Sequence, residues 1–121
     1  MARILLVEDQ HNIRLLIATL LRSRGHDIIE AEDGETAQAL LQNPPPFDIL
    51  ITDLQIPHID GEQLILLAKT HLPNLVTLAV SAYHDRLVDA QANGADSILT
   101  KPFSHHQLIA AITSMVEMLP D

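Results

Sequence analysis

Five short apolar runs alternate along this chain with segments whose apolar residues recur at helical spacing. Each run is rich in Ile, Leu, Val or Ala and is bounded by polar or turn residues, which is typical of strands buried on both faces of a parallel sheet. The predicted strands span residues 4–7, 27–30, 48–52, 76–80 and 97–99. Strands and helices that alternate in this way restrict the chain to an α/β architecture built from βαβ units.

The segments that follow the strands predict five helices. The second helix begins near Asp33 and ends before the three prolines at 44–46, which cannot continue a helix. The fourth, near residues 85–92, is short and only weakly apolar. The residues expected to face the core are Ile13, Leu16, Ile17, Leu20 and Leu21 in the first helix, Ala37, Leu40 and Leu41 in the second, and Leu108, Ile112, Met115, Val116 and Leu119 in the fifth.

Two helices carry the spacing of a capping box at their start. Asp60 is followed three residues later by Gln63, and Ser104 by Gln107, so each pair can satisfy free N–H groups of the first turn. Gly25 stands where the first helix is expected to end, because glycine accepts the backbone conformation of a C-terminal cap.

Right-handed crossovers between five such strands predict a flavodoxin-like (βα)5 fold, a doubly wound parallel sheet with the strand order 2-1-3-4-5. Ligands of such sheets bind beyond the carboxyl ends of the strands. No internal repeat or linker divides the sequence, so residues 1–121 are expected to form a single domain.

Composition and charge limit the classes of partner. The formal net charge of −9 repels nucleic-acid phosphates, so direct nucleic-acid binding is disfavoured. No apolar run approaches the roughly 20 residues of a membrane helix and no signal-peptide pattern is present, so a cytoplasmic chain without membrane contact is expected. The absence of cysteine excludes disulfides and thiolate metal sites.

Four predicted strands end in polar residues that suit one anionic site. The first is followed by Glu8 and Asp9, the third by Asp53, the fourth by Ser81 and the fifth by Lys101. Taken singly, each of these residues is more often a helix cap, a turn former or a surface residue. Carboxylates, a hydroxyl and an ammonium that converge from four strands on one rim instead favour a shared binding site.

The acidic residues predict a divalent cation at this rim. At about 5 Å and an effective dielectric near 20, each pair of carboxylates repels by roughly 3 kcal/mol, and a cation relieves that repulsion. Hard oxygen ligands with room for water suit Mg²⁺ or Mn²⁺. Asp9 and Asp53 are the expected direct ligands, Glu8 is expected to act through water, and the backbone carbonyl of Gln55 is expected to add an oxygen.

Asp53 is also a candidate nucleophile. A carboxylate can attack a phosphoryl phosphorus and form an aspartyl phosphate. Phosphoryl transfer depends on positioning and charge neutralisation, and here Lys101 can pair with one phosphoryl oxygen while the Ser81 hydroxyl donates to another.

These residues resemble the motifs of the response-regulator receiver domain over nearly the whole chain. The resemblance implies a phosphoacceptor signalling domain rather than an enzyme, with Mg²⁺ bound by the acidic pair and Asp53. It also implies a sensor histidine kinase or a histidine phosphotransfer protein as the phosphoryl donor, and a cis bond between Lys101 and Pro102. The motifs that carry the resemblance are ILLVED at 4–9, DLQIP at 53–57, Asp60-Gly61, Ser81-Ala82 and KPF at 101–103.

The chain departs from the family pattern at its switch residues. The family usually has Tyr or Phe three residues before the lysine, whereas this chain has Ile98, so signalling is expected to use Ile98 packing or backbone shifts. Ala82 and Pro102 belong to the same switch segments, and Gln55 and Tyr83 are expected to flank an attacking water and tune dephosphorylation. Few charges are available for the salt-bridged dimer of many relatives, so a monomer or weak dimer is expected. The sequence does not identify the output protein or domain.

Three other functions stay open at this point. An aspartate-dependent phosphatase also uses a nucleophilic Asp, a Lys and Mg²⁺, but it needs a second Asp where this chain has Gln55, and a cap for which the length leaves no residues. A flavin-binding domain of the same topology needs a phosphate loop, and Glu8 and Asp9 would repel that phosphate. Ile98 keeps open a receiver that acts as an interaction module without phosphorylation.

Overall fold

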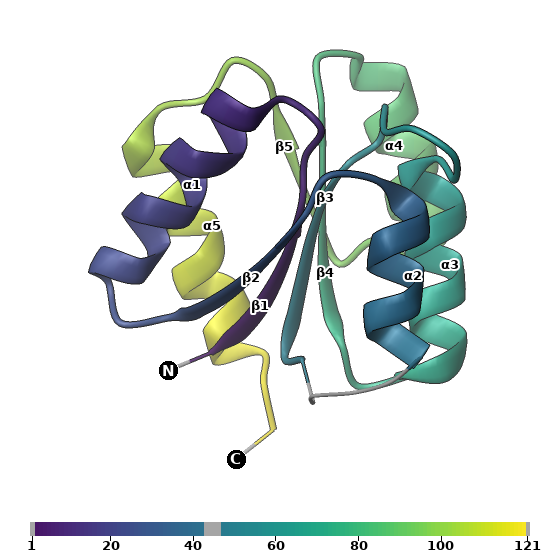
Figure 1. Ribbon diagram of the computed structural model, residues 1–121, viewed down its shortest axis with the longest axis horizontal. Coiled ribbons are helices and arrows are strands. Elements are labelled where there is room, and N and C mark those ends of the chain that lie inside the picture. Colours follow the sequence, from purple (N-terminus) through teal and green to yellow (C-terminus); the bar gives the residue numbers. More distant parts are fainter. Residues whose placement is uncertain (1, 43–46, 121) are drawn as a thin grey trace.

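The structure, a computed structural model, describes residues 2–42 and 47–120 and consists of a parallel sheet between two layers of helices (Figure 1). Strands and helices alternate along the chain. The strands are β1 (Arg3–Val7), β2 (Asp27–Ala31), β3 (Ile49–Asp53), β4 (Val76–Ser81) and β5 (Ser97–Thr100). The helices are α1 (His11–Ser23), α2 (Gly34–Gln42), α3 (Gly61–His71), α4 (His84–Ala92) and α5 (His105–Glu117).

The sheet has the strand order β2-β1-β3-β4-β5, and all neighbouring strands are parallel. The predicted flavodoxin-like fold and strand order are therefore confirmed, and both ends of each predicted strand lie within one residue of the observed bounds. Because the strands run in one direction, their carboxyl ends meet at one edge of the sheet, which is the upper edge in Figure 1.

The two faces of the sheet are covered by different helices. Successive strand residues point to opposite faces, so Leu5 and Leu50 pack in a core with α2, α3 and α4, whereas Ile4 and Ile49 pack in a core with α1 and α5. All four side chains are fully buried. Burial on both faces explains why the strands read as nearly continuous apolar runs.

The predicted helix faces are confirmed except at Leu16. Its side chain is 54% exposed, because it lies at the margin of the face that α1 packs on the sheet and borders an open hollow next to Lys101. The other expected core residues are buried or half-buried, namely Ile13, Ile17, Leu20, Leu21, Ala37, Leu40, Leu41, Leu108, Ile112, Met115, Val116 and Leu119.

The capping predictions differ in outcome. Ser104 and Gln107 form a complete capping box at the start of α5. At α3 only half of the box forms, since Asp60 accepts the Gln63 N–H at 2.9 Å while the Gln63 side chain lines the groove between α2 and α3. Gly25 follows α1 with a φ of 89°, as expected for a residue that ends a helix.

The second and fourth predicted helices are both present. α2 begins one residue after Asp33, whose carboxylate accepts the Thr36 N–H at 2.7 Å. The three prolines expected to form a loop lie outside the described residues. α4 is short and buries only Leu87 and Ala90 among its described side chains. Within residues 2–42 and 47–120, no helix combines the length and apolar character needed to cross a membrane.

The loop between β3 and α3 packs closely against the end of β3. The Gly61 N–H donates to the Leu54 carbonyl at 3.0 Å. A Cβ added at Gly61 would meet the Asp53 carbonyl oxygen and would lie 2.6 Å from the Leu54 Cα. This close approach of backbone to backbone fixes the chain directly after Asp53 and requires glycine at the start of α3.

Replacing Gly61 with alanine is therefore expected to destabilise the fold. In an unobstructed helix, alanine is more favourable than glycine by roughly 0.5–1 kcal/mol. Here the added methyl group has to displace the backbone next to Asp53, so we expect a net loss of about 1–3 kcal/mol in the free energy of unfolding. Urea unfolding of the variant measures the effect, and a variant as stable as the wild type would show that the loop has room to move.

Candidate functional site

The polar residues predicted for one site lie together at the carboxyl edge of the sheet. Glu8 follows β1, Asp53 and Ser81 are the last residues of β3 and β4, and Lys101 follows β5. The Lys101 N–H donates to the Ser81 carbonyl at 2.9 Å, which continues the pairing of β4 and β5 past their ends. Residues far apart in the sequence thus meet because their strands are neighbours.

The Lys101 ammonium joins the two buried carboxylates of this edge. Its Nζ donates to Glu8 Oε1 at 2.8 Å and also to Asp53 Oδ2. Glu8 is 3% exposed and Asp53 8% exposed, so neither charge is well solvated. Burial alone lowers the pKa of Lys101, but the hydrogen bonds with Asp53 and Glu8 outweigh burial and raise it. Lys101 is therefore charged, and it neutralises one of the two carboxylates that it contacts.

The Asp53 carboxylate is held from two sides. Oδ1 accepts the Gln55 N–H at 2.9 Å, and Oδ2 faces Lys101. The preceding Thr52 is fully buried, and its hydroxyl donates to the Asp53 carbonyl at 2.8 Å. The carboxylate is thus oriented at the rim of the sheet by a backbone donor and an ammonium, which suits a group that reacts in one direction.

The Glu8 carboxylate is fixed at both oxygens. Oε1 accepts from Lys101, and Oε2 accepts the Gln10 N–H at 3.1 Å. Burial raises the pKa of Glu8, and the hydrogen bonds from Lys101 and Gln10 oppose that rise without cancelling it. The Glu8 backbone carbonyl accepts from Arg14 Nη1 at 2.8 Å.

Arg14 was not among the residues expected at this site. It lies on α1, pairs with Glu30 on β2 at 3.3 Å, and its side chain is only 12% exposed. The guanidinium therefore ties the loop that carries Glu8 to two neighbouring elements. The sequence holds a partial signal, since Arg14 is the first cationic residue after the acidic pair, but its bond to a backbone carbonyl cannot be read from the pattern.

Ser81 is buried, and its hydroxyl is already hydrogen-bonded. Its Oγ accepts the backbone N–H of Tyr83 at 3.0 Å, and Tyr83 precedes the first residue of α4. The Ser81 side chain thus connects the edge of the sheet with the start of α4. A hydroxyl oxygen that accepts one bond still has its own proton to donate to a ligand.

The exposed predicted residues surround this buried group. Asp9, Gln55 and Tyr83 are exposed. Ile98 is half-buried and packs against the core that includes α4, and the Lys101-Pro102 bond is cis as predicted. Ala82 and Pro102, with apolar residues of α1, line a hollow of about 300 Å³ next to Lys101.

The expected crowding of three carboxylates differs from the arrangement observed. Among residues 2–42 and 47–120, no group of three or more His, Cys, Asp or Glu side chains is arranged to hold a metal ion. The reason is that Glu8 and Asp53 both turn toward Lys101, while Asp9 lies exposed. The available donors are all oxygens, and one of the two buried carboxylate charges is left over after pairing with Lys101. The donor chemistry of Asp9, Asp53 and the Gln55 carbonyl therefore fits a hard cation such as Mg²⁺.

Comparisons with known proteins agree on one family. The family model for the response regulator receiver domain matches residues 4–113. The response regulator protein FleR of Pseudomonas aeruginosa is 36% identical over 89% of this chain and 23% of its own length. The transcriptional regulatory protein CpxR of Escherichia coli is 35% identical over 96% of this chain and 50% of its own length.

A solved structure of a response regulator receiver domain is also similar to this chain. The receiver domain of a Francisella response regulator superposes with a TM-score of 0.87 at 27% identity, covering 97% of this chain and 98% of that one. The chain spans about half, or less, of the length of the curated relatives it matches.

Removing Lys101 is expected to destabilise the fold in a pH-dependent way. A Lys101→Ala variant leaves Glu8 and Asp53 buried without their shared cation, which costs roughly 3 kcal/mol near neutral pH. Burial raises the pKa of Glu8 above its ordinary value of 4.5, so the folded chain binds more protons than the unfolded chain just above that pH, and stability falls as the pH rises through that window. Loss of Lys101 raises the pKa of Glu8 further, so the deficit is smaller near pH 5 than near pH 7.

Urea unfolding of the wild type and the variant at both pH values measures this difference. A Glu8→Gln, Lys101→Ala double variant serves as the control, because it removes the repulsion and should recover much of the lost stability at neutral pH. An equal deficit at the two pH values would contradict the role given to Glu8.

Proposed function

Because this chain belongs to the response regulator receiver domain family, we propose that it accepts a phosphoryl group on Asp53 and passes a signal on by a change of conformation. The observation that supports this proposal most is the Lys101 ammonium held between the buried carboxylates of Asp53 and Glu8. A cation fixed at the reacting oxygen is what transfer of a phosphoryl group requires, because the reaction depends on neutralising charge.

The proposed phosphoryl donor is a phosphohistidine on a sensor kinase or a histidine phosphotransfer protein. An Asp53 carboxylate oxygen attacks the phosphorus, an oxygen–phosphorus bond forms, and the phosphorus–nitrogen bond breaks, so that the electron pair leaves with the donor imidazole. Lys101 pairs with one phosphoryl oxygen, and Ser81 donates its hydroxyl proton to another. The product is an aspartyl phosphate, which is one of the covalent intermediates formed by carboxylate nucleophiles.

Mg²⁺ or Mn²⁺ completes the proposed site. Asp9, Asp53 and the Gln55 carbonyl are the proposed direct ligands, and Glu8, already engaged with Lys101, acts through water. The bound ion supplies charge neutralisation at the phosphoryl oxygens. Gln55 and Tyr83, both exposed next to Asp53 and Ser81, are proposed to tune hydrolysis of the aspartyl phosphate.

The chain is proposed to act as a single cytoplasmic receiver domain, as a monomer or weak dimer, and to signal to an output protein or domain. Its charge of −9 disfavours direct contact with nucleic acid. Ile98 is proposed to transmit part of the change by its packing on the α4 side of the sheet. An aspartate-dependent phosphatase is the weaker alternative, since Gln55 stands where such enzymes need their acid.

Phosphorylation of Asp53 is tested with acetyl phosphate and Mg²⁺, followed by intact mass measurement. The wild type should gain the mass of one phosphoryl group. Asp53→Ala should gain none, and Lys101→Ala should react about 10²–10³ times more slowly because one fixed charge is lost. Asp85→Ala, which removes an exposed carboxylate on α4, is the control and should react like the wild type. A wild-type chain that gains no mass would favour an interaction module that works without phosphorylation.

Metal binding is tested separately by calorimetry with Mg²⁺. Asp9→Asn and Asp53→Asn should each weaken binding more than Glu8→Gln, because a direct ligand contributes more than one acting through water. Loss of the outer interaction is expected to cost about 10–100-fold in affinity. Asp85→Asn should leave the affinity unchanged, and equal binding by the wild type and Asp9→Asn would remove Asp9 from the ligand set.

A further inference from the structure

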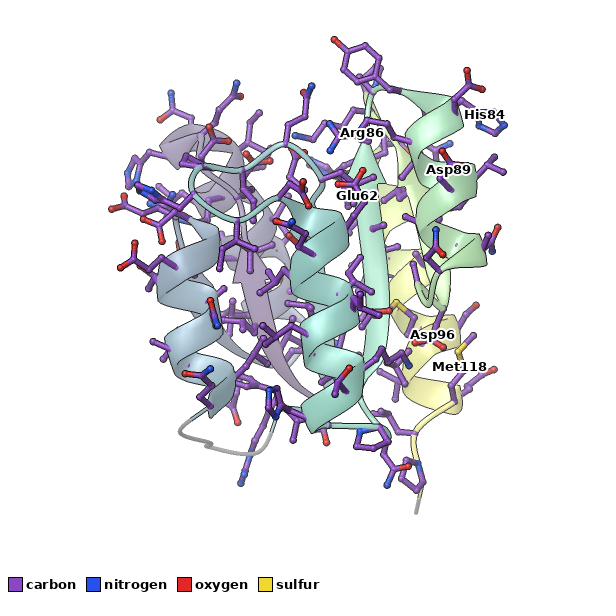
Figure 2. The ribbon with its side chains drawn as sticks, turned by 90° about the vertical axis from the view of Figure 1, so that its right-hand side faces the viewer. Glu62, His84, Arg86, Asp89, Asp96 and Met118 are labelled. Carbon is purple, nitrogen blue, oxygen red and sulfur yellow. The ribbon has the colours of Figure 1, made fainter. Side chains whose placement is uncertain are left out.

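Arg86 on α4 reaches across to the loop that follows the phosphoacceptor. Its Nη2 donates to the Leu54 carbonyl at 3.0 Å and to Glu62 Oε1 at 2.7 Å, while its Nε donates to Glu62 Oε2 at 2.9 Å. Figure 2 shows Arg86 and Glu62 extending toward one another between α4 and α3. Leu54 is the residue directly after Asp53, so one guanidinium connects the helix with the backbone next to the proposed reacting group.

The Leu54 peptide is the point where several elements meet. Its carbonyl also accepts the Gly61 N–H at 3.0 Å, and its own N–H donates to the Val80 carbonyl at 2.9 Å. A shift at Asp53 therefore moves a peptide that is already attached to β4 and α3, and Arg86 extends the attachment to α4. In the part of the chain that the structure describes, Arg86–Glu62 is the one ion pair that joins α3 and α4.

α4 packs on β4 and β5 through a small apolar face. It buries Leu87 and Ala90, and no side chain caps its start at Tyr83. The Tyr83 N–H is instead bonded to the Ser81 hydroxyl at 3.0 Å. Two hydrogen bonds at the start of α4, from the Tyr83 N–H and from Arg86, thus end on groups at or next to the proposed phosphorylation site.

On these contacts we propose that Arg86 is a positioning residue that couples the state of Asp53 to the position of α4 through the Leu54 carbonyl. The proposal rests on the proposed function, since it needs a change of state at Asp53. It gives the chain a physical route for the signal where Ile98 replaces the aromatic residue usual in the family.

The charge of Arg86 gives the two states of Asp53 different energies in this arrangement. The hydrogen bonds of Glu62 raise the pKa of Arg86, burial opposes the rise, and the charges of Glu62, Asp60 and Asp53 add to it. The guanidinium is hydrogen-bonded to the carbonyl of the residue directly after Asp53, so its charge lies near that side chain. A phosphoryl group carries more negative charge than a carboxylate. Phosphorylation of Asp53 therefore strengthens its attraction for the Arg86 guanidinium relative to the attraction of Glu62. A difference of this kind is what a conformational coupling requires.

Lys69 offers a matched control at the other edge of the sheet. Its Nζ pairs with Asp96 at 2.7 Å and donates to the Leu75 carbonyl at 2.7 Å, so it also joins a helix to a carboxylate and a backbone carbonyl. The two pairs have similar exposure, 24% and 33% for Lys69 and Asp96 against 32% and 33% for Arg86 and Glu62. Leu75 and Asp96 directly precede β4 and β5, far from the carboxyl edge.

The experiment measures amide hydrogen exchange in α4 with and without acetyl phosphate and Mg²⁺, for the full chain. In the wild type, phosphorylation should change the exchange rates of α4 amides. In Arg86→Ala the change should be at least about threefold smaller, while intact mass shows that Asp53 is still phosphorylated. Lys69→Ala should keep the wild-type change. Arg86→Lys should lie between, because an ammonium keeps the charge but cannot bind the carboxylate with two donors and reach the carbonyl as well.

Two results obtained with phosphorylated chains would overturn the coupling. One is a phosphorylated Arg86→Ala chain whose α4 responds as in the wild type, and the other is a Lys69→Ala chain whose response falls equally, which would show general loosening. A wild-type chain that takes up no phosphoryl group refutes the proposed function and the coupling with it. A chain that is phosphorylated but responds the same without Arg86 refutes the coupling alone.

Discussion

The arrangement at the carboxyl edge of the sheet depends on one ammonium shared by two buried carboxylates. Lys101 lies 93 residues from Glu8 and 48 from Asp53, so only the parallel order of the strands brings the three groups together. Two carboxylates at about 5 Å repel by roughly 3 kcal/mol at an effective dielectric near 20, and Lys101 reverses that cost by attracting both. One negative charge remains after this pairing, and the proposed divalent cation would neutralise it.

The fold and the position of this edge could be predicted because both depend on patterns within short segments of the sequence. Strands buried on both faces appear as apolar runs, and the residue after each run, such as Glu8 or Lys101, is placed at the edge by the direction of its strand. Ser104 and Gln107 likewise form their box because all its groups lie within one turn. These predictions needed only the spacing of residues along the chain and the handedness of crossovers.

The contacts of individual side chains could not be predicted in the same way. Asp9 was expected to crowd with Glu8 and Asp53, but those two carboxylates bind Lys101 while Asp9 is exposed. Arg14 binds the Glu8 carbonyl, and its position depends on Glu30 on another strand. Such cations act on backbone groups, which have no signature in the sequence. Which charged residues contact the site therefore depends on the tertiary structure.

Contacts of this kind also link the edge of the sheet to α4, although the chain has no aromatic residue at position 98. At position 98 the chain has an aliphatic side chain, and the sequence pattern alone suggests that the link between the edge and α4 is weakened. The start of α4 is nevertheless bonded to Ser81 through Tyr83 and to Leu54 through Arg86. Both are hydrogen bonds between a side chain and the backbone, and the one from Arg86 also carries a charge. In the proposed coupling, these two bonds let α4 respond to a change of charge at the edge of the sheet.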